Sequence, residues 1–287
     1  MTTPRLASMV AVLRPQFSKD GPDFALLLVR RSRSASFMAN AYVFPGGRID
    51  DADFSSAPED PFRHAAAREL AEEAGLSVND PQRLVRFAHW ITPSVEPKRF
   101  DAVCFLVSID ATHAAHGDVK VDGKEVFDPL WLTPTEALQR YLSGELNLPP
   151  PTVCTIEEMC AERRHALDQL VEQESSFLSH VDAPSRLISM ILARCENRRP
   201  HALLPKLVSA QSGQGIEIVL PWDPEFLSLP GEGSPFSGMG EGGLNPPQRI
   251  CRCILAFENG GAHADEAYAV KTPGTSTVRW RVKRLPS

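Results

Sequence analysis

Three glutamates between Arg68 and Leu76 have the spacing of a metal-binding helix face. Glu69, Glu72 and Glu73 stand at i, i+3 and i+4, so on a helix their carboxylates share one side. Like charges at this spacing repel each other, and a divalent cation that prefers oxygen ligands, Mg²⁺ or Mn²⁺, would offset that repulsion. Arg68 would stand beside Glu72 and could orient the cluster. The alternative is a solvated acidic face without a ligand.

The helix that carries these acids is predicted over residues 61–74. Asp60 can cap its N-terminus with Pro61 at the first position, and Gly75 is typical of a helix end. Leu70 and Ala74 belong to a small apolar arc on the opposite side, which suits packing on a sheet. This arrangement would leave the glutamates free to face a ligand.

A glycine turn precedes the helix at Gly46 and Gly47. Residues 42–47 read as a strand that ends in a Pro-Gly-Gly turn. Glycine lets the backbone approach a ligand closely, so the carbonyl of either glycine could serve as a third metal ligand.

The order of strand, glycine turn, connector and Arg-Glu-Leu-Ala-Glu-Glu-Ala-Gly-Leu resembles the Nudix box. The match is complete over residues 68–76. The connector of 20 residues, 48–67, is longer than the roughly thirteen that the family usually has there. Counted back from Arg68, the first Glu of the family pattern falls on Asp60, with Glu59 beside it. An N-cap role would explain Asp60 equally well.

The resemblance implies an α/β (α+β) fold, the Nudix α/β/α sandwich with a mixed sheet and a loop-rich C-terminal extension. It implies that Glu72 and Glu73 bind Mg²⁺ or Mn²⁺ and that Glu69 is a general base or a further ligand. Arg68 would orient the carboxylates. Glu125, in a loop that leads into a later strand, would complete the site, although it could also be a solvated strand-edge residue.

Segments outside the box resemble the branch of the family that includes the peroxisomal coenzyme A diphosphatases. They are residues 33–38, 90–93 with 99–101, and 148–152. This implies hydrolysis of the diphosphate linkage in coenzyme A (CoA) or acyl-CoA to 3′,5′-ADP and 4′-phosphopantetheine or its acyl derivative. Arg33 and Arg99 would contact substrate phosphates, unless they are simply solvated. An ADP-ribose or nucleoside-diphosphate-sugar pyrophosphatase stays open, and so does a catalytically silent Nudix-fold binding protein, because the connector is long.

The remaining pattern divides the chain into a Nudix domain at 8–150 and a helical, then loop-rich extension at 151–287 that packs on or caps it. Within the first part we expect an acidic, turn-rich segment at 48–62 and a stiff extended proline segment at 148–152. Apolar runs predict strands at 9–14, 24–30, 84–91, 100–109, 123–132, 217–220, 250–258 and 278–282, and helices at 133–144, 155–179 and 187–195.

Composition limits the partners. A chain of 287 residues with a net charge of −6 lacks the basic footprint of a nucleic-acid-binding protein. Six scattered cysteines form no zinc pattern and suit a reduced, intracellular setting, cytoplasmic or organellar (peroxisome or mitochondrion). We expect no signal peptide, no membrane span and no clear C-terminal peroxisomal signal. A small nucleotide substrate is the expected partner, and a homodimer is left open.

Overall fold

A seven-stranded mixed sheet forms the centre of the protein. The computed structural model describes residues 3–35, 37–94, 96–113, 119–173, 181–200, 202–209, 216–220, 250–257, 268–270 and 278–284. The central sheet contains β1 (Arg5–Ser18), β2 (Gly21–Arg31), β3 (Tyr42–Val43), β4 (Gly46–Arg48), β6 (Val85–Ile91), β7 (Phe100–Ser108) and β9 (Val126–Leu132).

The order of the sheet is β3-β2-β1-β7-β6, with β4 paired to β1 and β9 paired to β2. The β1–β7 pair is parallel, from Arg5 opposite Phe100 to Leu13 opposite Ser108. All other pairs in this sheet are antiparallel. Because β1 lies in the interior and both its faces are covered, its residues 10–13 are all apolar and fully buried.

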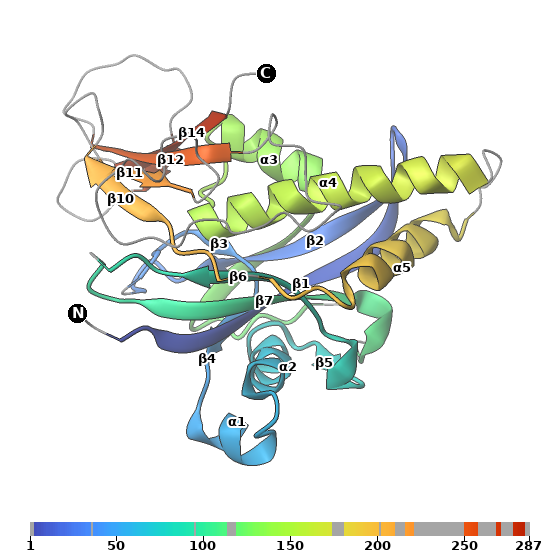
Figure 1. The fold of residues 1–287 in the computed structure, drawn as a ribbon, viewed down its shortest axis with the longest axis horizontal. Helices are drawn as coiled ribbons and strands as arrows, with labels where there is room; N and C mark the ends of the chain where they lie inside the picture. The colour runs from blue at the N-terminus through green and yellow to red at the C-terminus, as the bar shows by residue number, and fades with distance from the viewer. Residues whose placement is uncertain are drawn as a thin grey trace.

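Helices cover both faces of the sheet (Figure 1). On one face lie α1 (Asp51–Ser56) and α2 (Pro61–Ala74), and on the other α3 (Pro134–Leu142), α4 (Pro150–Gln173) and α5 (Ala183–Cys195). The predicted α/β sandwich with a mixed sheet is thus confirmed. Two short 3₁₀ turns, η1 (Pro81–Arg83) and η2 (Ile109–Ala111), and the small pair β5 (Ser77–Val78) and β8 (Thr112–His113) complete this part.

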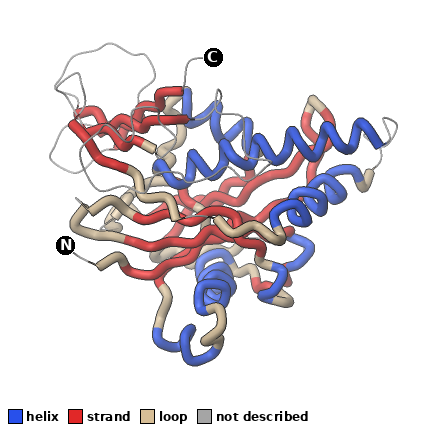
Figure 2. Tube along the Cα trace, in the orientation of Figure 1, coloured by secondary structure: helices blue, strands red, loops and turns tan. Residues whose placement is uncertain are grey.

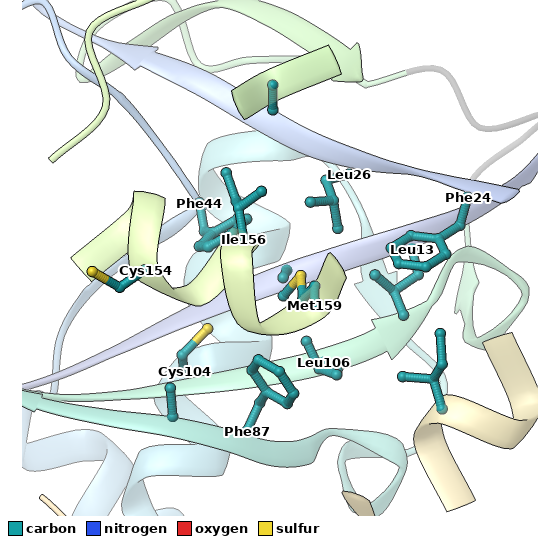
Figure 3. Packing of buried hydrophobic residues seen from close by; sticks show 14 of the residues in the cluster. Leu13, Phe24, Leu26, Phe44, Phe87, Cys104, Leu106, Cys154, Ile156 and Met159 are labelled. Carbon is teal, nitrogen blue, oxygen red and sulfur yellow. The ribbon is translucent and has the colours of Figure 1, made fainter. Parts of the chain in front are cut away.

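Each face of the sheet has its own hydrophobic core. Val10 and Val12 of β1 point toward α2, where they share a cluster with Leu70 and Ala74. The neighbouring residue Leu13 belongs to the opposite cluster, which also contains residues of β2, β6, β7, α4 and α5. Figure 3 shows this second core, with Ile156 and Met159 of α4 lying over Leu26, Phe87 and Leu106 of the strands.

Two predictions about connecting segments, residues 148–152 and 48–62, are wrong. The proline segment 148–152 is not extended throughout, because α4 begins at Pro150. Proline fits the first turn of a helix, where its missing N–H has no intrahelical partner to lose. The segment 48–62 contains α1, which is held by a capping box between Asp50 and Asp53. Six residues are too few for a recognisable helical period.

The C-terminal part contains a second, five-stranded antiparallel sheet (Figure 2). Its order is β10 (Lys206–Ser209), β11 (Ile216–Val219), β12 (Ile250–Phe257), β14 (Val278–Arg284) and β13 (Tyr268–Val270). Three of these strands were predicted; β10 and β13 were not. The predicted helix at 155–179 extends to residue 173, and its last residues lie outside the described chain. Since α4 and α5 share a core with the central sheet, the division of the chain at residue 150 stays a prediction.

Candidate active site

Helix α2 spans Pro61–Ala74, the range that the sequence predicts. The Asp60 carboxylate accepts a hydrogen bond from the Arg63 backbone N–H at 3.2 Å, and Gly75 ends the helix in the left-handed conformation at φ 67°. The apolar arc of the helix packs against β1. Both ends and one side of α2 are therefore fixed, and the acidic side is directed toward the glycine turn.

The Glu73 carboxylate lies against the glycine turn. Its Oε2 accepts a hydrogen bond from the Gly46 backbone N–H at 2.8 Å, and the residue is only 5% exposed. The pKa of Glu73 is raised to about 7, chiefly by burial; the charges of Glu69 and Glu125 also raise it, while the Gly46 N–H and the Arg31 charge lower it. A buried carboxylate with acidic neighbours is a position that a cation would stabilise.

The two glycines are required by close approach. A Cβ on Gly47 would lie 2.3 Å from Glu69 Oε1, and a Cβ on Gly46 would lie 2.2 Å from the Ser8 carbonyl oxygen. The predicted strand 42–47 is in fact two strands, β3 and β4, with a bend at Pro45, and both glycines belong to β4. This glycine turn is tightly packed between β1 and α2. Glu69 and Glu73 reach the same turn from successive positions of one helix face, as the i, i+4 spacing predicts.

Arg68 holds the acidic cluster from one side. Its Nη1 donates to Glu69 Oε1 at 3.0 Å and to Glu72 Oε2 at 3.1 Å, and its Nη2 donates to the Arg48 carbonyl at 2.9 Å. The pKa of Glu69 is raised overall, mainly by burial. The charges of Glu72 and Glu125 also raise it, whereas the Arg68 guanidinium lowers it. The predicted contact between Arg68 and Glu72 is confirmed.

Asp53, which the sequence analysis did not single out, anchors Arg68. Its side chain is fully buried and accepts hydrogen bonds from Arg68 Nη2 at 2.9 Å and Nε at 3.1 Å, and from the Asp50 N–H at 2.8 Å. His64 Nδ1 lies 2.7 Å from the same carboxylate. Burial alone would raise the pKa of Asp53, but the hydrogen bonds from Arg68, Asp50 and His64 together lower it to about 2.

The position that the resemblance assigns to the first glutamate of the box is therefore not filled by Asp60. Asp60 caps α2, and its carboxylate bonds Arg63 Nε at 3.0 Å and Arg86 Nη2 at 2.7 Å. Glu59 is in none of the described contacts of the cluster. A count forward from Gly47 would have found Asp53, which follows it by six residues, whereas the count backward from Arg68 crossed the lengthened connector.

Glu125 lies at the edge of this cluster. It is exposed, it lines the same cavity as the three helix glutamates, and its charge contributes to the raised pKa of Glu69 and of Glu73. Its own backbone N–H is bonded by the Asp122 carboxylate, which orders the loop before β9. Its predicted role as a metal ligand stays a prediction that this position supports.

The two arginines predicted to bind phosphate do not lie at the cavity. Arg99 Nε donates to the Thr92 carbonyl at 2.9 Å, Arg33 is exposed, and neither lines the cavity. In the part of the chain that the structure describes, the cations that line it are Arg5, Arg31, Arg48, Arg68 and Lys98. The phosphate contact predicted for Arg33 is thus better supported for Arg31, which lines the cavity and whose charge acts on Glu73.

A divalent cation fits this donor set. Within the described ranges, no three His, Cys, Asp or Glu side chains are already arranged to hold a metal ion, and Arg68 occupies Glu69 and Glu72. Even so, the buried Glu73 carboxylate and the largely buried Glu69 carboxylate meet at one glycine turn, and their pKa values are raised mainly by burial, with acidic neighbours adding to the rise. Carboxylates with adjacent backbone carbonyls are the ligands that Mg²⁺ and Mn²⁺ prefer.

These groups line one end of a cavity of about 680 Å³. The cavity is lined by residues of α2 and by Pro149 and Pro150 at the start of α4, two helices that lie on opposite faces of the sheet (Figure 1). Its size suits a ligand much larger than a diphosphate group. Among the helices described, none combines the length and apolar character needed to cross a bilayer.

Comparisons with known proteins agree with this geometry. The model of the NUDIX domain family matches residues 3–150, just over half of the chain. An acyl-coenzyme A diphosphatase NUDT19 from Xenopus laevis is 25% identical over 315 aligned positions, covering 76% of each chain. The putative nudix hydrolase 7 of Caenorhabditis elegans is 29% identical and covers 45% of this chain and 53% of its own length.

Among solved structures, a NUDIX hydrolase from Alicyclobacillus acidocaldarius is 25% identical, with a TM-score of 0.48, over 55% of this chain and 91% of its own. The family match includes the strands, the glycine turn and α2, which together form the acidic end of the cavity. This chain belongs to the NUDIX domain family and is, as its sequence predicts, a hydrolase that acts on diphosphate bonds.

Proposed function

We propose that the protein is a metal-dependent diphosphatase of coenzyme A and acyl-CoA. The products would be 3′,5′-ADP and 4′-phosphopantetheine or its acyl derivative. The observation that carries the proposal is the meeting of Glu69 and Glu73 at the Gly46–Gly47 turn, at one end of a cavity large enough for more than a diphosphate. The relative from Xenopus laevis, whose name specifies acyl-CoA, supports the choice of substrate.

In this proposal Glu72 and Glu73 hold Mg²⁺ or Mn²⁺, with the carbonyl of Gly46 or Gly47 as a further ligand. The cation would polarise the phosphoryl oxygens and lower the pKa of a bound water. Arg68 positions the carboxylates, because it bonds Glu69 and Glu72 directly. Arg31 and Lys98, on the cavity wall, are placed to neutralise phosphate oxygens of the substrate.

Glu69 is the residue best placed to take the proton from the attacking water. Its carboxylate is largely buried beside the turn, and burial raises its pKa, which favours proton acceptance. The alternative role, as a further ligand, makes a different prediction. If Glu69 is the base, Glu69→Gln would lower kcat without weakening Mn²⁺ binding. If Glu69 is a ligand, the same substitution would lower kcat and also weaken Mn²⁺ binding.

The silent binding protein is disfavoured by the lengthened connector itself. The connector includes α1, whose buried Asp53 holds Arg68 against Glu69 and Glu72. The connector thus supports the acidic cluster instead of disrupting it.

A panel of substrates tests the proposal. CoA, octanoyl-CoA, ADP-ribose and a nucleoside-diphosphate sugar would each be incubated with Mg²⁺ or Mn²⁺, with both products identified by mass. We expect kcat/KM to be highest for the CoA compounds and turnover to be lost in Glu73→Gln. A preference for ADP-ribose would replace the substrate assignment, and no metal-dependent product from any compound would favour a silent protein.

A further inference from the structure

Apart from the acids and cations, the cavity is lined in part by apolar side chains of five segments. They come from the β2–β3 loop, the facing ends of β6 and β7, the start of α4 and the chain after α5. We call them the distal wall: Phe37, Ile91, Phe100, Pro149, Pro150 and Pro205. The Phe37 and Phe100 rings face each other with centroids 5.1 Å apart, and the three prolines are buried.

Backbone pairing fixes the distal wall. Leu203 N–H donates to the His89 carbonyl at 2.8 Å, and the Leu203 carbonyl accepts from Ile91 N–H at 2.9 Å. This is a short parallel pairing at the free edge of β6, opposite Trp90. It places the chain two residues later, at Pro205, against the end of β6, where Thr92 N–H donates to the Phe100 carbonyl at 2.8 Å.

The chemistry of the distal wall excludes a phosphate and suits a hydrocarbon. The N-terminus of a long helix such as α4 would ordinarily attract an anion through its free N–H groups. Here Pro150 and Pro151 occupy its first two positions and offer no N–H. A phosphate placed there would lose its hydration without gaining donors, whereas a hydrocarbon would lose only contact with water.

The charged groups beside the distal wall lie toward solvent. Arg5 and Lys98 line the cavity next to Phe100 and are exposed. Pro149 and Pro150, by contrast, are buried. A ligand that spans the cavity would thus present its anionic part to these cations and to the metal proposed at the glutamates, and its apolar part to the distal wall.

We propose that the distal wall is an acyl-chain subsite, which makes the protein bind acyl-CoA more tightly than free CoA. The inference rests on the proposed function, since the acyl-CoA diphosphate must lie at the glutamates. Pro205 lies outside the part of the chain that matches the NUDIX family, residues 3–150. Preference for an acylated substrate would therefore depend partly on a segment that the family pattern does not include.

Affinity for a chain-length series tests the subsite without turnover. The dissociation constants of CoA, butanoyl-CoA and octanoyl-CoA would be measured by calorimetry on the full chain in EDTA. Burial of even two or three methylene groups corresponds to about a tenfold gain, so octanoyl-CoA should bind at least about tenfold more tightly than CoA. Equal constants across the series would overturn the inference.

Substitution then locates the effect. In Phe37→Ser the ratio of the dissociation constants of CoA and octanoyl-CoA should fall toward one, because the apolar ring of Phe37 no longer covers the acyl chain. Phe17→Ser is the matched control: Phe17 is 48% exposed near the end of β1 and does not line the cavity, so the ratio should keep its wild-type value. An unchanged ratio in Phe37→Ser would place the acyl chain elsewhere.

Turnover separates this inference from the proposed function. If CoA thioesters are cleaved but bind no more tightly than CoA, the acyl subsite is wrong and the diphosphatase assignment stands. If octanoyl-CoA binds more tightly but no CoA compound is cleaved with Mg²⁺ or Mn²⁺, the diphosphatase assignment fails and the apolar subsite stands.

Discussion

Removing the charge of Asp53 should destabilise the protein and loosen the acidic cluster together. The Asp53 carboxylate is fully buried and accepts two hydrogen bonds from Arg68 and one from the Asp50 N–H. Asparagine would keep one acceptor and turn an NH₂ group toward these donors. Loss of one partner of a buried ion pair costs about 3–5 kcal/mol.

The cost should lie below that range here, because Arg68 keeps other partners. Its side chain is 23% exposed and retains Glu69, Glu72 and the Arg48 carbonyl. We therefore expect Asp53→Asn to lower the free energy of unfolding by about 2–3 kcal/mol. Arg68 would also hold the glutamates less firmly, so kcat should fall about 10- to 100-fold, as for other lost supporting contacts.

Urea denaturation at pH 7, followed by circular dichroism, measures the effect. Asp51→Asn is the matched control, since Asp51 lies with Asp53 in the first turn of α1 but is exposed. It should lower the free energy of unfolding by less than about 1 kcal/mol. A double-mutant cycle with Arg68→Gln should give a coupling energy of at least about 1 kcal/mol. If Asp53→Asn costs no more than Asp51→Asn, Asp53 does not anchor Arg68.

The pH dependence provides a second check on the same contact. The pKa of Asp53 in the folded protein, about 2, lies below its ordinary value of 3.8. The ionised carboxylate therefore stabilises the fold fully above pH 4, and this contribution is lost as the pH falls from 4 toward 2. The difference in unfolding free energy between wild type and Asp53→Asn should shrink over that range; a constant difference would contradict the assigned pKa.

Three further outcomes follow from the site. Glu73→Gln should lower kcat by orders of magnitude, and it should abolish the rise in Tm that Mn²⁺ causes in wild type, whereas Glu172→Gln, at an exposed position of α4, should preserve both. Gly47→Ala should reduce turnover with little change in the free energy of unfolding, because its Cβ meets the movable end of the Glu69 side chain. Gly46→Ala should lower the free energy of unfolding by about 1–3 kcal/mol, because its Cβ meets backbone atoms of β1. A larger loss of stability in Gly47→Ala than in Gly46→Ala would refute this division. EDTA should stop turnover reversibly without unfolding the chain, as circular dichroism would show.

The sequence by itself determined the parts of the site that depend on local spacing. Helix α2 has the predicted bounds because its cap residues and its apolar arc lie within one short segment. The grouping of Glu69, Glu72 and Glu73 on one face follows from helical geometry alone, and so does the contact of Arg68 with Glu72. The close approach at Gly46 and Gly47 was predictable for the same reason, because only glycine tolerates it, whereas their place in strand β4 was not predicted.

What the tertiary structure decided depends on contacts between distant segments. Asp53 reaches Arg68 across 15 positions because α1 folds back onto α2; the spacing from Gly47 points to Asp53 but does not show its contact with Arg68. The choice of Arg31 over Arg33 at the cavity follows from the register of β2 at its end. The distal wall combines residues as far apart as Phe37 and Pro205, and Pro205 is placed there by the pairing of Leu203 with the edge of β6, a contact that local spacing does not specify.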